Sequence, residues 1–405
     1  MSARPATPKG ARTAARRAEG SPVSAARPPA GARTAARRTD GACLTSHPTR
    51  RAVLATAASL AAAGCALAPR RGARAVAPGD LREFVAPLPA TPQSHASTLV
   101  ETTDGALLAA WFGGTAERAP DVRIWLARRD GDAAAPWSAA RPVADGVQAD
   151  GSRLPTWNPV LFQPRGGPLL LFYKVGPDPT RWWGEVMRSA DGGRRWSAPT
   201  RLPAGILGPI RSKPLELADG TLLCPSSTEA ADGAWRIHFE RSTDRGLSWQ
   251  RGADVAAAPG LDAIQPSLAA RPDGRLLAFA RTRADCIART ESRDGGRSWS
   301  TLAPTALPNP NAGIEALALA DGRLLMVYNP GRSGRDWWDG RDRLDLALSH
   351  DNGAHWTRVA TLEDLPRQEF SYPAAIQTRD GRVHVSYTWE RTRIRHVVLD
   401  PANWP

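Results

Sequence analysis

Short apolar runs that directly follow a glycine turn recur along the chain. The copies are "DGALLAAW" from Asp104, "RGGPLLLFY" from Arg165, "DGTLLCP" from Asp219, "DGRLLAFA" from Asp273, "DGRLLMVY" from Asp321 and "DGRVHVSY" from Asp380. Each turn is typical of a tight hairpin, because glycine accepts the positive φ that such turns require. Each apolar run is typical of a strand that is buried on both faces.

The spacing of these six copies predicts a repeat architecture. They follow one another at steps of roughly 48–62 residues, with strand signals and no helical periodicity, which is typical of the blades of a β-propeller. We therefore predict an all-β fold, a six-bladed β-propeller, over residues 79–405. A strand around residues 84–88 is expected to complete the last blade, because a closed ring leaves no free sheet edge.

A second motif falls about 25 residues after the glycine turns. Its four clear copies are "SADGGRRW" from Ser189, "STDRGLSW" from Ser242, "SRDGGRSW" from Ser292 and "SHDNGAHW" from Ser349, and "RRDGDAAAPWS" from Arg128 is a degenerate copy. The Ser and Asp side chains suit hydrogen bonds to backbone N–H groups of their own turn. The Trp suits packing between neighbouring blades. We therefore assign these motifs to the outer hairpin of each blade and to structure rather than chemistry.

Composition supports strands and turns, and the position of the charge excludes one class of partner. The 405 residues include 36 Gly and 36 Pro, with 6% aromatic residues, which favours short strands over long helices. The net charge of +13 suggests nucleic-acid binding at first sight. Residues 1–78 hold 14 of the 53 basic residues and 2 of the 40 acidic ones, so the remainder carries a net charge of only +1. The predicted propeller is nearly neutral, and we expect no nucleic-acid partner.

The basic leader divides into two predicted segments. Residues 1–47 are rich in Ala, Arg and Pro and contain "GARTAARR" twice, a composition that cannot bury a core and predicts disorder. Residues 48–78 resemble a twin-arginine export signal, with Arg50 and Arg51 before an uncharged apolar stretch and a lipoprotein-type cleavage site at Cys65. We expect an exported protein, periplasmic or extracellular. Lipidation at Cys65, plain cleavage and a chance extension of the reading frame all remain open.

The rest of the sequence gives no sign of a membrane span or a metal site. No later stretch approaches the roughly 20 apolar residues that a spanning helix needs, so membrane contact is expected only through a lipid anchor at Cys65. The remaining cysteines are Cys43, Cys224 and Cys286, and their spacing implies neither a zinc site nor a disulfide framework. A single bridge between Cys224 and Cys286 stays open. We expect no metal and no cofactor.

The repeated turns resemble the Asp-boxes (BNR repeats) of the sialidase superfamily, whose members are six-bladed propellers. The segments "HASTLVE", "WFGGT", "PDVRIWLARR", "WNPVLF", "YKVG" and "SYPAAIQTRDG" make the chain similar to exported sialidase-like proteins of bacteria. Such boxes also occur in propellers that are not sialidases. Function must therefore be argued from the residues on the propeller axis.

The resemblance implies a set of catalytic residues at matching positions. Sialidases use a tyrosine nucleophile, because an anionic anomeric centre repels a carboxylate, and Tyr372 in "SYPAAIQTRDG" matches it. Glu117 in "GGTAERAPDVRIW" stands nearest the acid/base position, and Asp121 matches a structural aspartate. The glutamate that assists the nucleophile has no direct match. Asp262 in "GLDAIQPSL" and Glu315 in "NAGIEALAL" are the two candidates.

The carboxylate-binding arginines of sialidases are matched only in part. Arg281, after "DGRLLAFA", matches the second arginine, and Arg341 in "GRDRLDLAL" matches the third, with Arg343 as a rival. His95 in "HASTL" stands where the first arginine is expected. Arginine holds a carboxylate with two parallel hydrogen bonds, which histidine cannot do. A uronic acid or another acidic sugar therefore fits better than sialic acid.

Two lysines complete the candidate site. Lys174 in "FYKVG" and Lys213 in "RSKPLEL" are candidates for anion binding, because lysine is otherwise rare in this arginine-rich chain. The predicted function is an exo-acting glycoside hydrolase that acts on a terminal acidic sugar, with a carbohydrate as its partner. The alternatives are a polysaccharide lyase or rhamnosidase-type enzyme with His95 as base, and a glycan-binding propeller without catalysis.

Overall fold

The computed structural model describes residues 74–75, 81–131, 135–336 and 338–405. They belong to one compact unit, Pro69–Pro405. The predicted segments 1–47 and 48–78, including Cys65, lie outside the described residues except for Arg74 and Ala75. In the part described, no helix is long and apolar enough to cross a membrane.

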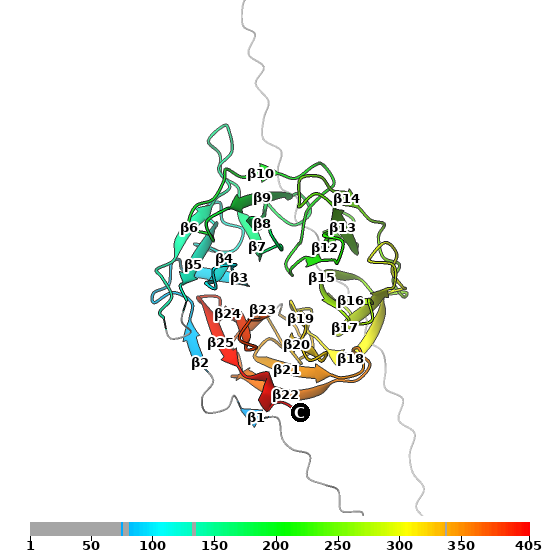
Figure 1. Ribbon diagram of the computed structural model, residues 1–405. Coiled ribbons are helices and arrows are strands. Elements are labelled where there is room, and N and C mark those ends of the chain that lie inside the picture. The colour runs from blue at the N-terminus through cyan, green and yellow to red at the C-terminus, as the bar shows by residue number, and fades with distance from the viewer. Residues whose placement is uncertain (1–73, 76–80, 132–134, 337) are drawn as a thin grey trace, which may run out of the picture. The chain divides into compact units, whose positions relative to one another are not determined.

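Six sheets stand around a central axis, as Figure 1 shows, and consecutive strands within each blade are antiparallel. Blade 1 contains β3 (Gln93–Glu101), β4 (Leu107–Gly114), β5 (Arg123–Arg129) and β6 (Arg141–Ala144). Blade 2 contains β7 (Thr156–Phe162), β8 (Leu169–Val175), β9 (Trp183–Ser189) and β10 (Thr200–Arg201). Blade 3 contains β11 (Leu215–Glu216), β12 (Leu222–Glu229), β13 (Trp235–Ser242) and β14 (Gln250–Arg251). The predicted six-bladed β-propeller is confirmed.

The second half of the chain forms three further blades. Blade 4 contains β15 (Ala263–Ala270), β16 (Leu276–Thr282), β17 (Cys286–Ser292) and β18 (Ala303–Pro308). Blade 5 contains β19 (Glu315–Ala318), β20 (Leu324–Tyr328), β21 (Arg343–Ser349) and β22 (Thr357–Asp364), with β1 (Arg74–Ala75) parallel to β22. Blade 6 contains β23 (Phe370–Gln377), β24 (Val383–Trp389) and β25 (Arg393–Leu399), and the 3-10 helix η1 (Pro401–Asn403) follows it.

An N-terminal strand closes the ring. β2 (Leu81–Phe84) pairs antiparallel with β25, with Leu81 opposite Val398 and Phe84 opposite Arg395. The closing strand was expected around residues 84–88 and lies slightly earlier in the chain. Glu83 on this strand accepts hydrogen bonds from His396 of blade 6 at 2.8 Å and from Trp137 of blade 1 at 3.1 Å. The strand therefore joins the first and last blades with side chains as well as backbone.

The Asp-boxes connect the third and fourth strands of blades 2 to 5, as predicted. In the box after β13, the backbone N–H of Gly246 donates to Ser242 at 2.7 Å and that of Ser248 donates to Asp244 at 2.8 Å. The box tryptophans pack on the preceding blade, and the ring of Trp299 stacks on Phe239 at 3.9 Å between centroids. The boxes are structural turns, because their polar groups bond within the turn itself.

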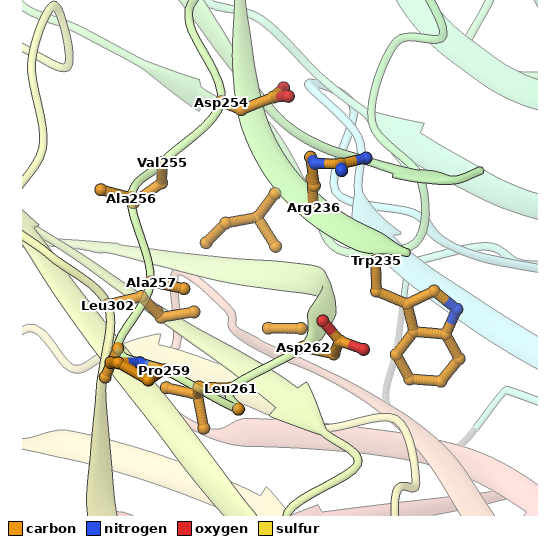
Figure 2. Close-up of a pocket in the computed structure, with 14 residues that line it drawn as sticks. Trp235, Arg236, Asp254, Val255, Ala256, Ala257, Pro259, Leu261, Asp262 and Leu302 are labelled. Carbon is orange, nitrogen blue, oxygen red and sulfur yellow. The ribbon is translucent and has the colours of Figure 1, made fainter. Parts of the chain in front are cut away.

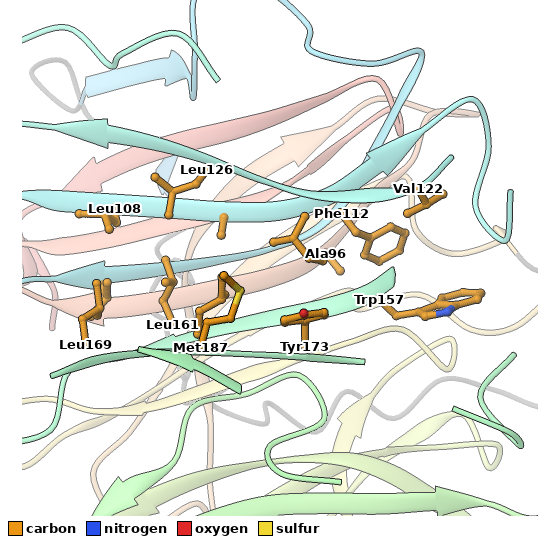
Figure 3. Packing of buried hydrophobic residues seen from close by; sticks show 14 of the residues in the cluster. Ala96, Leu108, Phe112, Val122, Leu126, Trp157, Leu161, Leu169, Tyr173 and Met187 are labelled. Atoms are coloured by element: carbon orange, nitrogen blue, oxygen red, sulfur yellow. The ribbon is translucent and has the colours of Figure 1, made fainter. Parts of the chain in front are cut away.

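The core lies between adjacent blades. Figure 3 shows one such interface, where Leu108, Phe112 and Leu126 of blade 1 face Leu161 and Tyr173 of blade 2. Every residue of β4 is buried, because one sheet face packs on each neighbouring blade. This explains why the second strands β4, β8, β16 and β20 contain continuous apolar runs rather than alternating ones.

A bulge recurs in the innermost strands and positions the axial residues. The register shifts within β3, β7, β15 and β23, and each shift contains one non-glycine residue with positive φ. These residues are Ala96 (φ 52°), Asn158 (φ 42°), Gln265 (φ 54°) and Tyr372 (φ 54°). Left-handed backbone is uncommon for such residues and marks strain that often serves a site. A bulge re-aims the side chain it carries, so Tyr372 and Gln265 occupy equivalent places in different blades.

Candidate functional site

Three arginines surround Tyr372 on the innermost strand of blade 6. The Tyr372 hydroxyl accepts a hydrogen bond of 2.5 Å from Nη1 of Arg281. The guanidinium carbons of Arg281, Arg211 and Arg341 lie 5.5, 5.9 and 6.0 Å from the centroid of the Tyr372 ring. These arginines come from blades 4, 3 and 5, so the site lies on the propeller axis. A half-buried phenol among three guanidinium groups is suited to bind an anion beside a nucleophilic oxygen.

The structure distinguishes Arg341 from Arg343, the two candidates in blade 5 for the third carboxylate-binding arginine. Arg341 is buried; its Nη1 lies 3.3 Å from Glu369 Oε1 and its Nη2 donates to the carbonyl of Asn311 at 3.1 Å. Arg343, two residues further on, donates to Asp345 of its own strand at 2.9 Å. Arg341 therefore belongs to the axial cluster, whereas Arg343 stabilises the blade.

Glu117 lies on the loop that connects β4 and β5. Asp121 anchors this loop, because its carboxylate accepts hydrogen bonds from the Thr115 hydroxyl and from the Thr115 backbone N–H at 2.9 Å. The Thr115 hydroxyl bond is the largest cause that lowers the pKa of Asp121. The backbone N–H of Glu117 donates to the Gln93 side chain at 3.0 Å, and its carboxylate pairs with Arg391 at 2.5 Å.

A chain of ion pairs joins Glu117 to the arginine cluster. Arg391 lies between Glu117 and Glu369, with its Nε 2.8 Å from Glu369 Oε2. The other carboxylate oxygen of Glu369 pairs with Arg341 and accepts a bond of 2.9 Å from Ser371. The candidate acid and the surroundings of Tyr372 therefore form one connected network.

His95 packs directly against Tyr372. The ring centroids lie 4.3 Å apart, and Nδ1 of His95 is 2.9 Å from the Thr388 hydroxyl. Burial lowers the pKa of His95 well below its ordinary value, and the positive charges of Arg391, Arg341, Arg281 and Arg211 lower it further. His95 is therefore neutral at pH 7 and does not supply the charge of an arginine.

Neither candidate for the assisting carboxylate bonds to the Tyr372 hydroxyl. Glu315 pairs with Arg211 at 3.1 Å and accepts a bond of 3.0 Å from Ser212. Asp262 pairs with Arg283 at 3.1 Å, and about half of its side chain is exposed. Gln265 takes the bulge position of blade 4, and its buried Oε1 has no hydrogen-bond partner among the described residues. Blade 4 was expected to supply a carboxylate that assists the Tyr372 nucleophile. At its bulge position it carries the neutral amide of Gln265 instead.

Arg211 of blade 3 contacts residues of blades 5 and 6 next to Tyr372, and no sequence motif marked it as a site residue. Its Nη1 donates to the carbonyl of Pro373 at 2.6 Å, and its Nη2 contacts Glu315 at 3.1 Å and the carbonyl of Ile314. The Pro373 contact fixes the residue that follows Tyr372 in the bulge. No sequence motif identified Arg211, Arg391 or Glu369, because their partners lie far away in the sequence or in irregular turns.

The two lysines have different surroundings. Nζ of Lys213 lies 3.3 Å from the Thr98 hydroxyl across the axis, and burial lowers its pKa to about 8. Lys174 is fully buried and donates to the carbonyl of Pro209 at 2.8 Å, and burial lowers its pKa to about 7. Lys174 is therefore committed to the packing between blades 2 and 3, and the structure does not bring it to Tyr372.

The described residues contain no group of three or more His, Cys, Asp or Glu side chains arranged to hold a metal ion. Cys224 and Cys286 are both free thiols, so the bridge left open by the sequence is not formed. The cluster around Tyr372 consists of a phenol, guanidinium groups, carboxylates and an imidazole.

Comparison with known proteins agrees with the fold. The model of the BNR repeat-like domain family matches residues 105–385. The anhydrosialidase of Macrobdella decora is 23% identical over 215 residues, which cover 47% of this chain and 26% of that protein. The match therefore spans about a quarter of the length of that curated relative.

Solved structures of sialidases share the architecture at low identity. The NanB sialidase of Streptococcus pneumoniae has a TM-score of 0.63 at 13% identity, over 80% of this chain and 71% of that chain. The Trypanosoma rangeli sialidase in complex with sialic acid has a TM-score of 0.63 at 17% identity, over 81% and 60%. A Dyadobacter fermentans protein of unknown function has a TM-score of 0.61 at 20% identity, over 80% and 100%. With a family match across most of its propeller, this chain belongs to the BNR repeat-like domain family and is a sialidase-like protein.

Proposed function

We propose that this protein is an exo-acting glycoside hydrolase that removes a terminal sugar bearing a carboxylate. The observation that carries the proposal is the contact between Arg281 and the Tyr372 hydroxyl, inside a cluster that also contains Arg341. A carboxylate bound by these arginines would hold the anomeric carbon beside the phenolic oxygen. A tyrosine is the suitable nucleophile there, because the negative substrate repels a carboxylate.

The proposed reaction has two steps. The Tyr372 hydroxyl gives its proton to water as its oxygen attacks the anomeric carbon, the glycosidic bond breaks, and the departing oxygen takes a proton from Glu117. A water molecule, deprotonated by Glu117, then displaces the Tyr372 oxygen and releases the sugar. Arg281 stabilises the charge on the phenolic oxygen in both steps through its hydrogen bond.

The neutral state of His95 supports a uronic acid or a related acidic sugar over sialic acid. Two arginines of the expected three are present, and the third position carries an uncharged ring that packs on Tyr372. Arg211 lies near Tyr372, but Glu315 and two backbone carbonyls already engage it. The carboxylate would therefore be held by Arg281 and Arg341.

His95 also supports a second candidate reaction. A neutral imidazole 4.3 Å from the Tyr372 ring could take a proton from a uronic acid in a polysaccharide lyase, or act as base in a rhamnosidase-type enzyme. A lyase yields an unsaturated product that absorbs in the near ultraviolet, whereas hydrolysis yields a saturated sugar. Tight binding of glycans without any product would instead indicate a binding propeller.

The deciding experiment is a screen of glucuronic, galacturonic and sialic acid glycosides with purified residues 69–405. Turnover of one of them, lost in both Tyr372→Phe and Glu117→Gln, is the expected result. Tyr328→Phe is the matched control, because Tyr328 is a buried tyrosine in the core of blade 5. Unchanged turnover in both site variants would exclude the proposed mechanism.

Export and lipid anchoring remain a separate proposal. The resemblance of residues 48–78 to a twin-arginine signal with Cys65 supports it. We expect the full chain to fractionate with membranes in a bacterium that processes lipoproteins, and Cys65→Ala to release it. Membrane association of Cys65→Ala equal to that of the parent would contradict anchoring at this cysteine.

A further inference from the structure

Gln265 carries a buried polar atom that the proposed reaction does not use. The residue is only 4% exposed, and its side-chain oxygen, Oε1, accepts no hydrogen bond from any described residue. A buried acceptor without a donor is destabilising and is rare in folded proteins. An oxygen of this kind beside a candidate active site indicates that a ligand supplies the missing donor.

The backbone places Gln265 at the position that corresponds to Tyr372. Each is the first residue of the bulge in its innermost strand, each has φ 54°, and each is followed by a proline. The backbone N–H of Gln265 donates to the Ser227 hydroxyl at 3.1 Å, which holds this bulge against blade 3. Because a bulge re-aims the side chain that it carries, equivalent bulges direct both side chains towards the axis.

Arg281 is the nearest cross-strand neighbour of this bulge. Ile264, directly before Gln265, pairs with Arg281 on β16. Nη1 of Arg281 donates to the Tyr372 hydroxyl, whereas its buried Nε has no hydrogen-bond partner among the described residues. A donor and an acceptor that both lack partners therefore lie on adjacent strands of blade 4. A ligand that carries a carboxylate and a neighbouring hydroxyl group can satisfy both.

Asp262, three residues before Gln265, has different surroundings. It lines a cavity of about 420 Å³ between the start of β13 and the connection that leads to β15, as Figure 2 shows. Neither Gln265 nor Arg281 lines that cavity. We therefore assign the unpartnered oxygen of Gln265 to the cluster around Tyr372.

The chemistry of acidic sugars distinguishes which of them supplies the missing donor. In a uronic acid the carboxylate is attached to C5, and the adjacent C4 carries a hydroxyl group that can donate a hydrogen bond. In sialic acid the carboxylate is attached to C2, and the adjacent C3 is a methylene group without a donor. A carboxylate on Arg281 brings its adjacent ring carbon beside β15, where Gln265 lies. A uronic acid then satisfies Oε1, whereas sialic acid leaves it unpaired.

We propose that Gln265 determines specificity by accepting a hydrogen bond from the C4 hydroxyl of a terminal uronic acid whose carboxylate binds Arg281. The inference rests on the proposed function, because it takes Arg281 as a carboxylate-binding residue. It adds that the substrate is selected by a hydroxyl group as well as by its charge. A neutral amide suits this role, because a carboxylate at the same position would repel the carboxylate of the substrate.

The kinetic test compares glycosides with and without this hydroxyl group. The substrates are p-nitrophenyl glucuronides and galacturonides, in both anomeric forms, and their 4-deoxy counterparts. For the sugar that is cleaved, we expect kcat/KM to be at least roughly tenfold higher than for its 4-deoxy counterpart. Gln265→Leu should reduce this ratio to about one, because the variant has no acceptor. A ratio that is the same in the parent and in Gln265→Leu overturns the proposal.

Two further variants separate hydrogen bonding from packing. Gln265→Glu keeps an acceptor oxygen at nearly the same size, so we expect it to retain the preference for the C4 hydroxyl. Gln377→Leu is the matched control, since Gln377 bonds to Ala320 and Gly381 at the other end of β23, and it should also retain the preference. Loss of the preference in Gln265→Glu or in Gln377→Leu overturns the proposal.

A binding measurement keeps this test separate from the test of catalysis. Calorimetry on Tyr372→Phe compares free glucuronic and galacturonic acid with their 4-deoxy forms. We expect Gln265→Leu in that background to weaken binding of one hydroxyl-bearing acid roughly tenfold and to leave binding of its 4-deoxy form nearly unchanged. Equal effects on both forms, or no binding of either acid by Tyr372→Phe, overturns the proposal.

The two proposals fail in distinguishable ways. If glucuronic or galacturonic acid binds through its C4 hydroxyl and Gln265 but no glycoside is ever cleaved, the proposed hydrolase fails while Gln265 remains a recognition residue. Cleavage of a sialic acid glycoside in preference to both uronic acids, lost in Tyr372→Phe, overturns the role of Gln265 and leaves the hydrolase in place.

Discussion

The hydroxyl of Tyr372 accepts a hydrogen bond from Arg281 at 2.5 Å, although the two residues are 91 positions apart in the chain. One contact therefore joins the candidate nucleophile of blade 6 to the candidate carboxylate-binding arginine of blade 4. A substrate carboxylate that binds Arg281 has to share the guanidinium group with the Tyr372 oxygen. Binding and activation of the nucleophile are coupled at this arginine, and the consequences can be measured.

Replacement of Arg281 should impair both binding and chemistry. Arg281→Gln removes a charge that is buried beside Tyr372, and loss of such a partner costs about 2–5 kcal/mol, so we expect kcat/KM for the acidic substrate to fall at least roughly a hundredfold. Steady-state kinetics measure this. Arg343→Gln is the matched control, since Arg343 bonds to Asp345 within its blade. If Arg343→Gln lowered kcat/KM more than Arg281→Gln does, the assignment of carboxylate binding to Arg281 would be wrong.

His95 should not titrate in the activity profile of the hydrolase. Because its pKa lies well below the ordinary value of 6.5, it stays neutral as the pH falls from 8 to 6. We expect His95→Asn to keep the shape of the pH profile of kcat/KM above pH 6, whatever happens to the height of that profile. Disappearance of a limb of the profile in His95→Asn, together with an ultraviolet-absorbing product, would favour the lyase mechanism.

Arg211 should act as a positioning residue for Tyr372. Arg211→Lys keeps the positive charge but cannot bond to the carbonyl of Pro373 and to Glu315 with the same fork. We expect kcat to fall at least roughly tenfold while KM changes less, because the phenolic oxygen is misplaced after the substrate binds. Arg271→Lys is a control, as Arg271 also links blades by side-chain hydrogen bonds but lies away from Tyr372. Equal losses of kcat in Arg211→Lys and Arg271→Lys would show that Arg211 has a general structural role and does not position Tyr372.

Glu83 should make closure of the ring sensitive to acid. Burial raises the pKa of Glu83, but hydrogen bonds from His396 and Arg129 and their charges outweigh it and lower the pKa to about 2. Since the folded-state pKa lies below the ordinary value of 4.5, the stabilisation is complete above pH 4.5 and is lost as the pH falls towards 2. We expect Glu83→Gln to reduce the free energy of unfolding at pH 7 by about 1–3 kcal/mol.

The measurement for Glu83 is urea unfolding of the parent and the variant at several pH values. Their difference should shrink between pH 4.5 and pH 2, because the parent carboxylate takes up a proton over that range. Glu101→Gln serves as a control, since the Glu101 carboxylate lies 3.9 Å from the Arg379 guanidinium group and accepts its 3.0 Å hydrogen bond from the backbone N–H of Arg379, which a glutamine oxygen can also accept. A difference that stays constant with pH would show that the Glu83 charge does not hold the closing strand.

The candidate site was only partly predictable from the sequence. Tyr372, Arg281, Glu117 and Arg341 could be proposed because the resemblance to sialidases gives a role to each matching position, and the structure places them in one connected cluster. Arg341 and Arg343 could not be separated by sequence, since they are two positions apart and the sequence does not show that Arg341 lies in the irregular segment before β21 whereas Arg343 begins that strand. Arg211 was invisible, because its partner Pro373 lies 162 positions away.

The sequence by itself determined the blades. Their turns close with bonds over four residues, such as Gly246 to Ser242, and apolar runs that follow the glycine turns form buried strands such as β4 and β8, so local chemistry specifies the number and order of the blades. Only the tertiary structure decided which charges meet on the axis. Arg391 reaches Glu117 across 274 positions, and this contact exists only because the closed ring brings the first and last blades together. The physical reason is that turn geometry acts over a few residues, whereas the state of a buried charge depends on every group that folding brings within a few ångströms of it.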